Sequence, residues 1–324
     1  MKKKTTSAKP KGKQVVIVEM GLRDGLQNEK TVLDADTRVE FTKRLIEAGT
    51  KRVEIGSFVS PTWVPQMAGT AEVVEKTFAL VKGKVIPKKT EFSVLVPNER
   101  GMQDAIKAGV KEVAIFAASS ESFSYKNINC SIEESFKRFE PVMALAKKHK
   151  IKVRGYLSTC FGCPFEGKVS EAKVIKLAQR MHKMGVYEIS IGDTIGVADA
   201  GQVESMFKKL KKVVPVKKIA GHFHDTRGQA LANILAAYKQ GVTIFDASLG
   251  GLGGCPYAPG ATGNVATEDV VYMFHGMGLK TGLNLEKLIE INHWMAGKIQ
   301  HTLPSKVGKV GRLKPLGKVG GPRS

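Results

Sequence analysis

Short apolar runs alternate with helix-length amphipathic stretches along most of this chain, and this alternation restricts the possible folds more than any other feature. Eight of the runs have the length and composition of buried strands. They cover Val15–Met20, Arg52–Gly56, Glu91–Val96, Glu112–Ala117, Lys152–Leu157, Tyr187–Gly192, Ile219–His224 and Thr243–Ser248. Strands that are separated by helices form parallel sheets, so the pattern predicts an α/β fold.

The amphipathic stretches between these runs predict the crossover helices. Several of them end at a glycine just before the next strand, as at Gly49 and Gly185, which is the usual way for a helix to stop. The clearest helices are predicted over Asp36–Ala48, Ile132–His149, Ser170–Met184, Ala200–Lys212 and Arg227–Gln240. Eight strands with crossover helices favour a closed (β/α)₈ TIM barrel over an open doubly wound sheet. An extra C-terminal helical segment is predicted from Leu283 to Leu303.

Length and charge divide the chain into one domain and two tails. Its 324 residues are 42% hydrophobic, which suits a single barrel with a large core. The net charge is +21, and residues 1–13 and 306–324 together hold twelve lysines and arginines and no acid. These segments are also rich in glycine and proline. We therefore predict a disordered basic tail over 1–13, a catalytic domain over 14–305, and a second disordered basic tail over 306–324.

Composition also limits the partners and the compartment. Basic tails can bind nucleic acid, but no aromatic residues are interleaved for base stacking, so we interpret them as solvated and do not expect nucleic acid as a partner. No apolar run is long enough to cross a membrane, and the N-terminus lacks the apolar core of a secretory signal. Four cysteines do not suggest a disulfide scaffold, and Cys160 and Cys163 are expected to be thiols that are packed or lie in a loop. A cytoplasmic location fits best.

The residues that are suited to catalysis recur where the predicted strands end. In a TIM barrel the active site lies at the carboxyl ends of the strands and in the loops after them. The candidates here are Arg23 and Asp24 after the first strand, Glu54 in the second, Arg154 in the fifth, Asp193 in the sixth, His222 and His224 in the seventh, and Cys255 and Asn264 after the eighth. Although they are spread over more than 240 residues, the fold would bring them to one opening, and this favours an enzyme.

The His-x-His pair in His222–His224 predicts a metal site. Residues two apart on a strand point to the same side, so both imidazoles would face one point. Such a pair can also consist of one buried and one exposed histidine. Asp24 and Asn264 would add a carboxylate and an amide oxygen, and this donor set suits Mg²⁺ or Mn²⁺ better than a structural zinc ion. Asp225 is interpreted instead as the cap of the following helix.

Four other residues are candidates for the chemistry itself. Arg23 could stabilise a developing enolate or bind a carboxylate, or it could form a salt bridge with Asp24. Glu54 and Asp193 could act in acid–base chemistry if they are buried near a cation, or they could be surface carboxylates. Cys255 lies in a glycine-rich segment and could be an acid, a base, a nucleophile or an inert thiol.

Three segments resemble the family of 3-hydroxy-3-methylglutaryl-CoA (HMG-CoA) lyases. They are the R-D-G-L-Q-N-E-K segment at 23–30, the S-F-V-S-P and W-V-P-Q-M segments between 57 and 67, and G-L-G-G-C-P-Y-A at 251–258 with Gly260, Gly263 and Asn264. The resemblance extends from about Val15 to Gln300. The first segment is shared with the isopropylmalate and homocitrate synthases, whereas the others are specific for the lyases.

The resemblance implies a reaction and a role for each residue. The family cleaves HMG-CoA to acetyl-CoA and acetoacetate by a retro-Claisen step, in leucine degradation and ketone-body formation. Its metal would be held by Asp24, His222, His224 and Asn264, with Arg23 at the enolate oxygen and Cys255 moving protons. Glu54 and Asp193 match important acids, and Gln27, Lys30 and Arg154 match positions that support the site. An acyl-CoA substrate and a homodimer are expected.

One alternative on the same barrel is a synthase that condenses acetyl-CoA with a 2-oxo acid. The cysteine in the glycine-rich segment and the absence of a long C-terminal regulatory region both favour the lyase.

Overall fold

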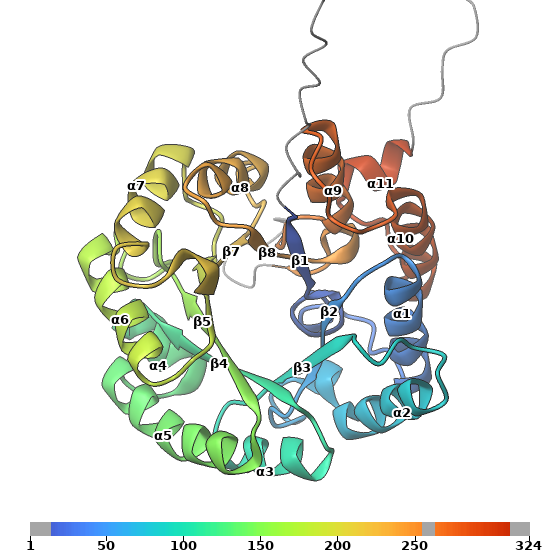
Figure 1. Ribbon diagram of the computed structural model, residues 1–324, viewed down its shortest axis with the longest axis horizontal. Helices are drawn as coiled ribbons and strands as arrows, with labels where there is room; N and C mark the ends of the chain where they lie inside the picture. The colour runs from blue at the N-terminus through green and yellow to red at the C-terminus, as the bar shows by residue number, and fades with distance from the viewer. Residues whose placement is uncertain (1–13, 255–262, 312–324) are drawn as a thin grey trace, which may run out of the picture.

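Eight parallel strands form a closed barrel in the computed structural model, which describes residues 14–254 and 263–311 (Figure 1). The strands are β1 Val16–Glu19, β2 Arg52–Ser57, β3 Glu91–Leu95, β4 Glu112–Ala118, β5 Lys152–Ser158, β6 Glu188–Asp193, β7 Ile219–Phe223 and β8 Ile244–Ala247. Each strand pairs with the next, and β1 pairs with β8 to close the barrel. The predicted TIM barrel and all eight predicted strands are confirmed.

The helices surround the barrel and connect its strands (Figure 1). The α-helices are α1 Ala35–Glu47, α2 Thr70–Lys82, α3 Glu99–Lys107, α4 Glu121–Ile128, α5 Ile132–His149, α6 Glu171–Lys183, α7 Ala200–Leu210, α8 Ala230–Lys239, α9 Thr267–Gly276, α10 Leu285–Ile299 and α11 Lys306–Val310. Short turns of helix are η1 Gly21–Gly25, η2 Pro65–Met67, η3 Val216–Lys218 and η4 Leu249–Gly251. The five predicted crossover helices and the C-terminal helical segment are confirmed to within a few residues.

Local sequence signals set several helix ends. Asp34 caps α1 by accepting a hydrogen bond from the backbone N–H of Thr37 at 2.7 Å. Gly49 follows α1 with a positive φ of 102°, and a Cβ there would lie 2.3 Å from the carbonyl oxygen of Gly282. No side chain fits at that position, so the glycine is required both by its dihedral angle and by the close approach of the chain.

Alternation along the strands separates an outer apolar core from a mixed barrel interior. Val53 and Ile55 of β2 belong to the large core, which lies between the strands and the helices. Glu54 lies between them in the sequence and is fully buried, on the opposite face of the strand. The same alternation brings Arg154 of β5 and Asp246 of β8 into the barrel. Charged side chains therefore lie inside the barrel, below the carboxyl ends of the strands.

The C-terminal helices pack against the start of the chain. Figure 1 shows α10 and α11 beside α1 and α9, and these helices are in contact. No helix among the described residues is long and apolar enough to span a bilayer.

The predicted start of the second tail at residue 306 is wrong. Residues 306–310 form α11, because Ser305 caps this helix and buried Asp269 binds its first turn. Asp269 accepts hydrogen bonds from the hydroxyl of Ser305 and from the backbone N–H groups of Lys306 and Val307, at 2.9, 3.1 and 2.8 Å. Residues 1–13 and 312–324, for which disorder is predicted, lie outside the described residues.

Truncation tests the importance of α11. A protein ending at Gly311 should melt at the wild-type temperature, whereas one ending at Ser305 should melt several degrees lower. The second truncation removes two backbone donors from buried Asp269, which costs about 1–3 kcal/mol. In a large domain each kcal/mol lowers the melting temperature by roughly 2–4 °C. Differential scanning calorimetry on both proteins gives the comparison, and equal melting temperatures would contradict it.

Candidate active site

A cavity of about 1070 Å³ opens at the carboxyl ends of the strands. It extends from the ends of β5, β6 and β7 to η1, to the segment before η2, and to α4. Among the predicted site residues, Arg23, Asp24, Gln27, His222 and His224 line it. The convergence that was expected from the strand ends is therefore present in the fold. This is where a TIM barrel places its reactive groups.

A single turn of π-helix, η1, presents Arg23 and Asp24 to the cavity. The N–H of Gly25 donates to the carbonyl of Met20, five residues earlier, at 3.0 Å. The N–H of Gly21 donates to a carboxylate oxygen of Glu19 at 2.9 Å. A Cβ at residue 25 would lie 2.7 Å from the hydroxyl oxygen of Ser248. The glycine after Arg-Asp is thus needed for the turn to lie close to η4.

Asp24, His222 and His224 form a cluster suited to a metal ion. Their ligand atoms all lie within 4.8 Å of one another. The Oδ2 atom of Asp24 is 3.8 Å from Nε2 of His222 and 3.9 Å from Nε2 of His224. Both imidazoles therefore face one carboxylate, as the His-x-His spacing predicts. Asn264 donates its amide nitrogen to the same Oδ2 at 2.7 Å, so its oxygen would reach an ion only after a rotation of the amide.

The protonation states of this cluster fit a divalent cation. Burial opposes ionisation of Asp24, but Arg23 and the two imidazoles outweigh it and lower the pKa of the carboxyl to about 2. Burial and neighbouring His222 lower the pKa of His224 to about 4, so its imidazole is neutral at neutral pH. Among the described residues, the buried Nδ1 of His224 has no hydrogen-bond partner. An anionic carboxylate oxygen and a neutral imidazole nitrogen are ligands suited to such an ion.

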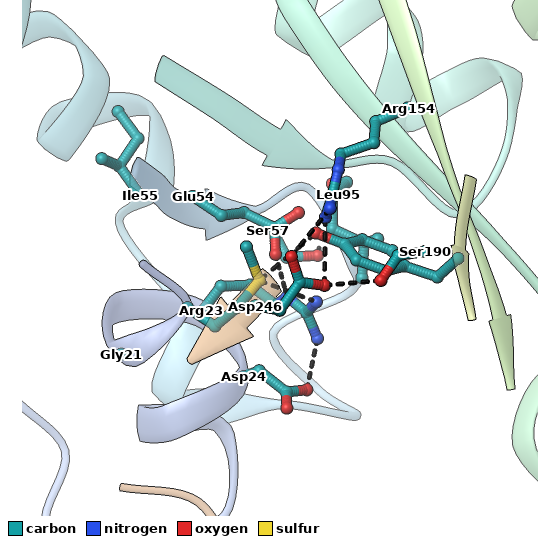
Figure 2. Close-up of polar contacts among 12 residues, drawn as sticks. Gly21, Arg23, Asp24, Glu54, Ile55, Ser57, Leu95, Arg154, Ser190 and Asp246 are labelled. Atoms are coloured by element: carbon teal, nitrogen blue, oxygen red, sulfur yellow. Dashed lines mark hydrogen bonds and ion pairs between the residues drawn. The ribbon is translucent and has the colours of Figure 1, made fainter. Parts of the chain in front are cut away.

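Arg23 is fixed from two sides, as Figure 2 shows. Its Nε donates to Glu54 and its Nη1 donates to Asp24, each at 2.5 Å. Burial alone would lower the pKa of Arg23, but the two carboxylates outweigh this effect and raise the pKa above its usual value. Burial also raises the pKa of Glu54, whose second oxygen has no partner among the described residues. The salt bridge and the candidate catalytic role of Arg23 are therefore compatible, since the bridge holds the guanidinium at the cavity.

Other predicted site residues lie beside the cavity or away from it. Asp193 is buried behind it and accepts hydrogen bonds from the N–H groups of Val197 and Ala198 at 3.0 and 3.1 Å. Its carboxylate thus holds the loop after β6. Lys30 is exposed and does not line the cavity.

Two further predictions concern Arg154 and Cys255. Arg154 does not line the cavity either, because its guanidinium is fully buried against Glu188 and Asp246. Cys255 lies outside the described residues, but Gly254, which directly precedes it, lines the cavity. The carbonyl of Gly254 accepts a hydrogen bond from the amide of Asn28 at 3.0 Å.

The prediction for Asp225 is confirmed in part. Its carboxylate accepts from the N–H of Ala230 at 3.0 Å and so holds the start of α8, although that helix begins three residues later than expected. Asp225 also pairs with Lys306 of α11 at 3.0 Å.

Sequence reasoning missed three buried polar residues near the site. Glu19 binds η1 and η4, Tyr156 lies under the guanidinium of Arg23 at 5.2 Å, and Asp246 contacts His222. The two acids do carry a signal, because each is a lone carboxylate inside an apolar strand. Such a residue is buried at a cost and has a binding partner in the fold. The sequence does not identify these partners, most of which come from distant parts of the chain.

Comparison with known proteins identifies the family of this chain. The HMGL-like family matches residues 14–295. A rat protein named mitochondrial hydroxymethylglutaryl-CoA lyase is 50% identical over 92% of this chain and 89% of its own length. A second rat protein, named cytoplasmic 3-hydroxy-3-methylglutaryl-CoA lyase, is 48% identical over 91% of this chain and 84% of its own.

A solved structure gives the same result at the level of the fold. The HMG-CoA lyase from Acinetobacter baumannii, in complex with coenzyme A and 3-methylmalate, is 35% identical. It superimposes with a TM-score of 0.87 over 94% of this chain and 97% of its own. Sequence identity and fold agree, and the chain belongs to the HMGL-like family of carbon–carbon lyases.

Proposed function

We propose that this chain cleaves HMG-CoA to acetyl-CoA and acetoacetate and that it needs Mg²⁺ or Mn²⁺ to do so. The observation that carries the proposal is the convergence of Asp24, His222 and His224 at a large cavity in a member of this family. Asn264 would complete the donor set after rotation of its amide. The carboxylate of Asp24 is held ionised by its neighbours.

The reaction breaks the bond between C2 and C3 of the substrate. A bound divalent cation would supply Lewis-acid polarisation of the 3-hydroxyl group, which must lose its proton. The electron pair of the broken bond moves to the thioester and forms an enolate. Arg23, whose guanidinium Glu54 and Asp24 hold at the cavity, is placed to stabilise the enolate oxygen. We assign both proton transfers to Cys255: its thiolate accepts the hydroxyl proton, and the thiol formed in this way then protonates the enolate carbon to give acetyl-CoA.

Supporting roles follow from the contacts. Glu54 orients Arg23, Asp193 holds the loop after β6, and Gln27 lines the cavity, where it can contact the substrate. Lys30 is exposed and would act on the outer part of the substrate. The cavity is large enough for an acyl-CoA thioester end, and coenzyme A is bound in the relative from Acinetobacter baumannii.

The physiological setting is part of the proposal. We infer a role in leucine degradation or ketone-body formation, in which acetoacetate is released, and a homodimeric assembly. We also propose a cytoplasmic location, because Cys130, Cys160 and Cys163 are buried free thiols. The rat relatives are named for both the mitochondrion and the cytoplasm.

Removal of the metal tests the function. Acetoacetate release from HMG-CoA, followed in a coupled assay, should stop after treatment with EDTA and return with added Mg²⁺ or Mn²⁺. Replacement of His224 by alanine removes one ligand and should lower turnover and metal affinity by roughly 10–100-fold. The matched control is His149→Ala, since His149 is exposed at the end of α5. Full activity of the metal-free enzyme would refute the metal role, and the absence of acetoacetate under all conditions would refute the reaction.

A further inference from the structure

The two imidazoles of the proposed metal site are held in different ways. Nδ1 of His222 lies 3.2 Å from Oδ2 of Asp246, whereas Nδ1 of His224 has no partner among the described residues. Asp246 lies on β8 and His222 on β7, where the parallel register pairs them directly. Their side chains therefore meet on the interior face of the barrel. Asp246 has no exposed atoms through which water could take the place of His222.

The contacts of Asp246 determine which ring nitrogen of His222 carries a proton. Arg154 donates to both oxygens of Asp246, at 2.7 and 3.2 Å, and the hydroxyl of Ser190 donates to Oδ2 at 2.7 Å (Figure 2). A carboxylate that is paired with a guanidinium is ionised and can only accept hydrogen bonds. The Nδ1 atom of His222 must then carry the proton. In the neutral imidazole Nε2 then keeps its lone pair, and this atom lies on the side of Asp24, 3.8 Å from its carboxylate.

Further ion pairs hold Asp246 in place. Nε of Arg154 donates to Glu188 at 2.6 Å, and Arg52 binds both oxygens of Glu188 at 2.9 and 3.0 Å. Arg154 also lies over the ring of Tyr156, 5.0 Å from its centroid. A continuous row of opposite charges thus extends from the base of the barrel to His222. Asp246 cannot turn away from His222 without breaking its two bonds to Arg154.

We propose that Asp246 is a positioning residue that fixes the tautomer and the ring orientation of His222, so that Nε2 is presented to the metal. The role of Arg154 follows from this, because Arg154 acts on the site through Asp246. The inference rests on the proposed metal site. Within the described part of the chain nothing supports Nδ1 of His224 in this way, so His224 should depend on the ion itself for its orientation.

The test uses Asp246→Asn in the full chain, which keeps the size of the side chain but removes its charge. Mn²⁺ binding, measured by electron paramagnetic resonance, should weaken by roughly 10–100-fold, as for the loss of other partners of ligating histidines. Long-range ¹H–¹⁵N spectra of the metal-free protein should show His222 protonated at Nδ1 in the wild type and a tautomer mixture in the variant. The spectrum of His224 should change little.

The matched control is Ser190→Ala, which removes one hydrogen bond from the same carboxylate oxygen of Asp246 but leaves the charge of Asp246 in place. The tautomer of His222 and the Mn²⁺ affinity should stay near wild-type values.

The two proposals can fail separately. Unchanged Mn²⁺ affinity and an unchanged His222 tautomer in Asp246→Asn would overturn the role of Asp246. A wild-type protein that binds no Mn²⁺ would refute the metal site, and the tautomer of the metal-free protein would still decide whether Asp246 fixes His222. If unpaired Arg154 prevents Asp246→Asn from folding, the double variant with Arg154→Gln removes both charges together, and the same loss of affinity is expected.

Discussion

An Arg23→Lys variant should lose roughly 10²–10³-fold in kcat while its KM changes little. Lysine keeps the charge but has no planar fork, so it cannot bind Glu54 and Asp24 and still face the enolate oxygen. The enolate develops only during bond cleavage, so the loss belongs to the transition state and appears in kcat. Steady-state kinetics of acetoacetate release at saturating metal measure both constants.

The control for this experiment is Arg44→Lys. Arg44 lies on the outer surface of α1 and forms an exposed ion pair with Glu40, so its replacement should leave both constants unchanged. A change in KM alone for Arg23→Lys would show that Arg23 binds the ground state of the substrate. The assignment of Arg23 to the enolate oxygen would then be wrong.

Replacement of Cys255 by serine should lower kcat by roughly 10²–10⁴-fold, the usual contribution of a general acid or base. A hydroxyl group is a much weaker acid than a thiol, so proton transfer becomes slow, while the ligands of the metal remain in place. Gly254, the residue before Cys255, lines the cavity, so the segment that carries the thiol starts at the site. Single-turnover kinetics and Mn²⁺ titration together separate slow chemistry from lost metal binding.

Alkylation distinguishes Cys255 from the other cysteines. Burial raises the pKa of Cys160 to about 12 and also raises the pKa of Cys130, so both should react slowly with iodoacetamide at neutral pH. Mass spectrometry after limited treatment should show that inactivation follows modification of Cys255 and that substrate protects it. Inactivation that follows Cys130, with Cys255 unmodified, would remove the case for a catalytic thiol.

The sequence determined the architecture because the relevant signals are local. Apolar strand runs, amphipathic stretches and glycines such as Gly49 and Gly185 repeat often enough to define eight βα units, and eight such units close into a barrel. Strand alternation also placed His222 and His224 on one side. The barrel rule then brought Asp24 to them from 200 residues away. These predictions needed only two general rules. Side chains alternate between the two faces of a strand, and barrel enzymes have their active sites at the carboxyl ends of the strands.

Tertiary structure decided the contacts made across the barrel. Arg154 was predicted to support the site, and the fold places its guanidinium against Asp246, which the pairing of β7 with β8 brings to His222. The end of the domain was also misplaced, because the six basic residues from 306 onward suggested a tail, whereas buried Asp269 binds the backbone there and starts α11. In both cases the partner is distant in the sequence. A chain of residues specifies which charges must be buried, and the packing of its strands and helices decides what they bind.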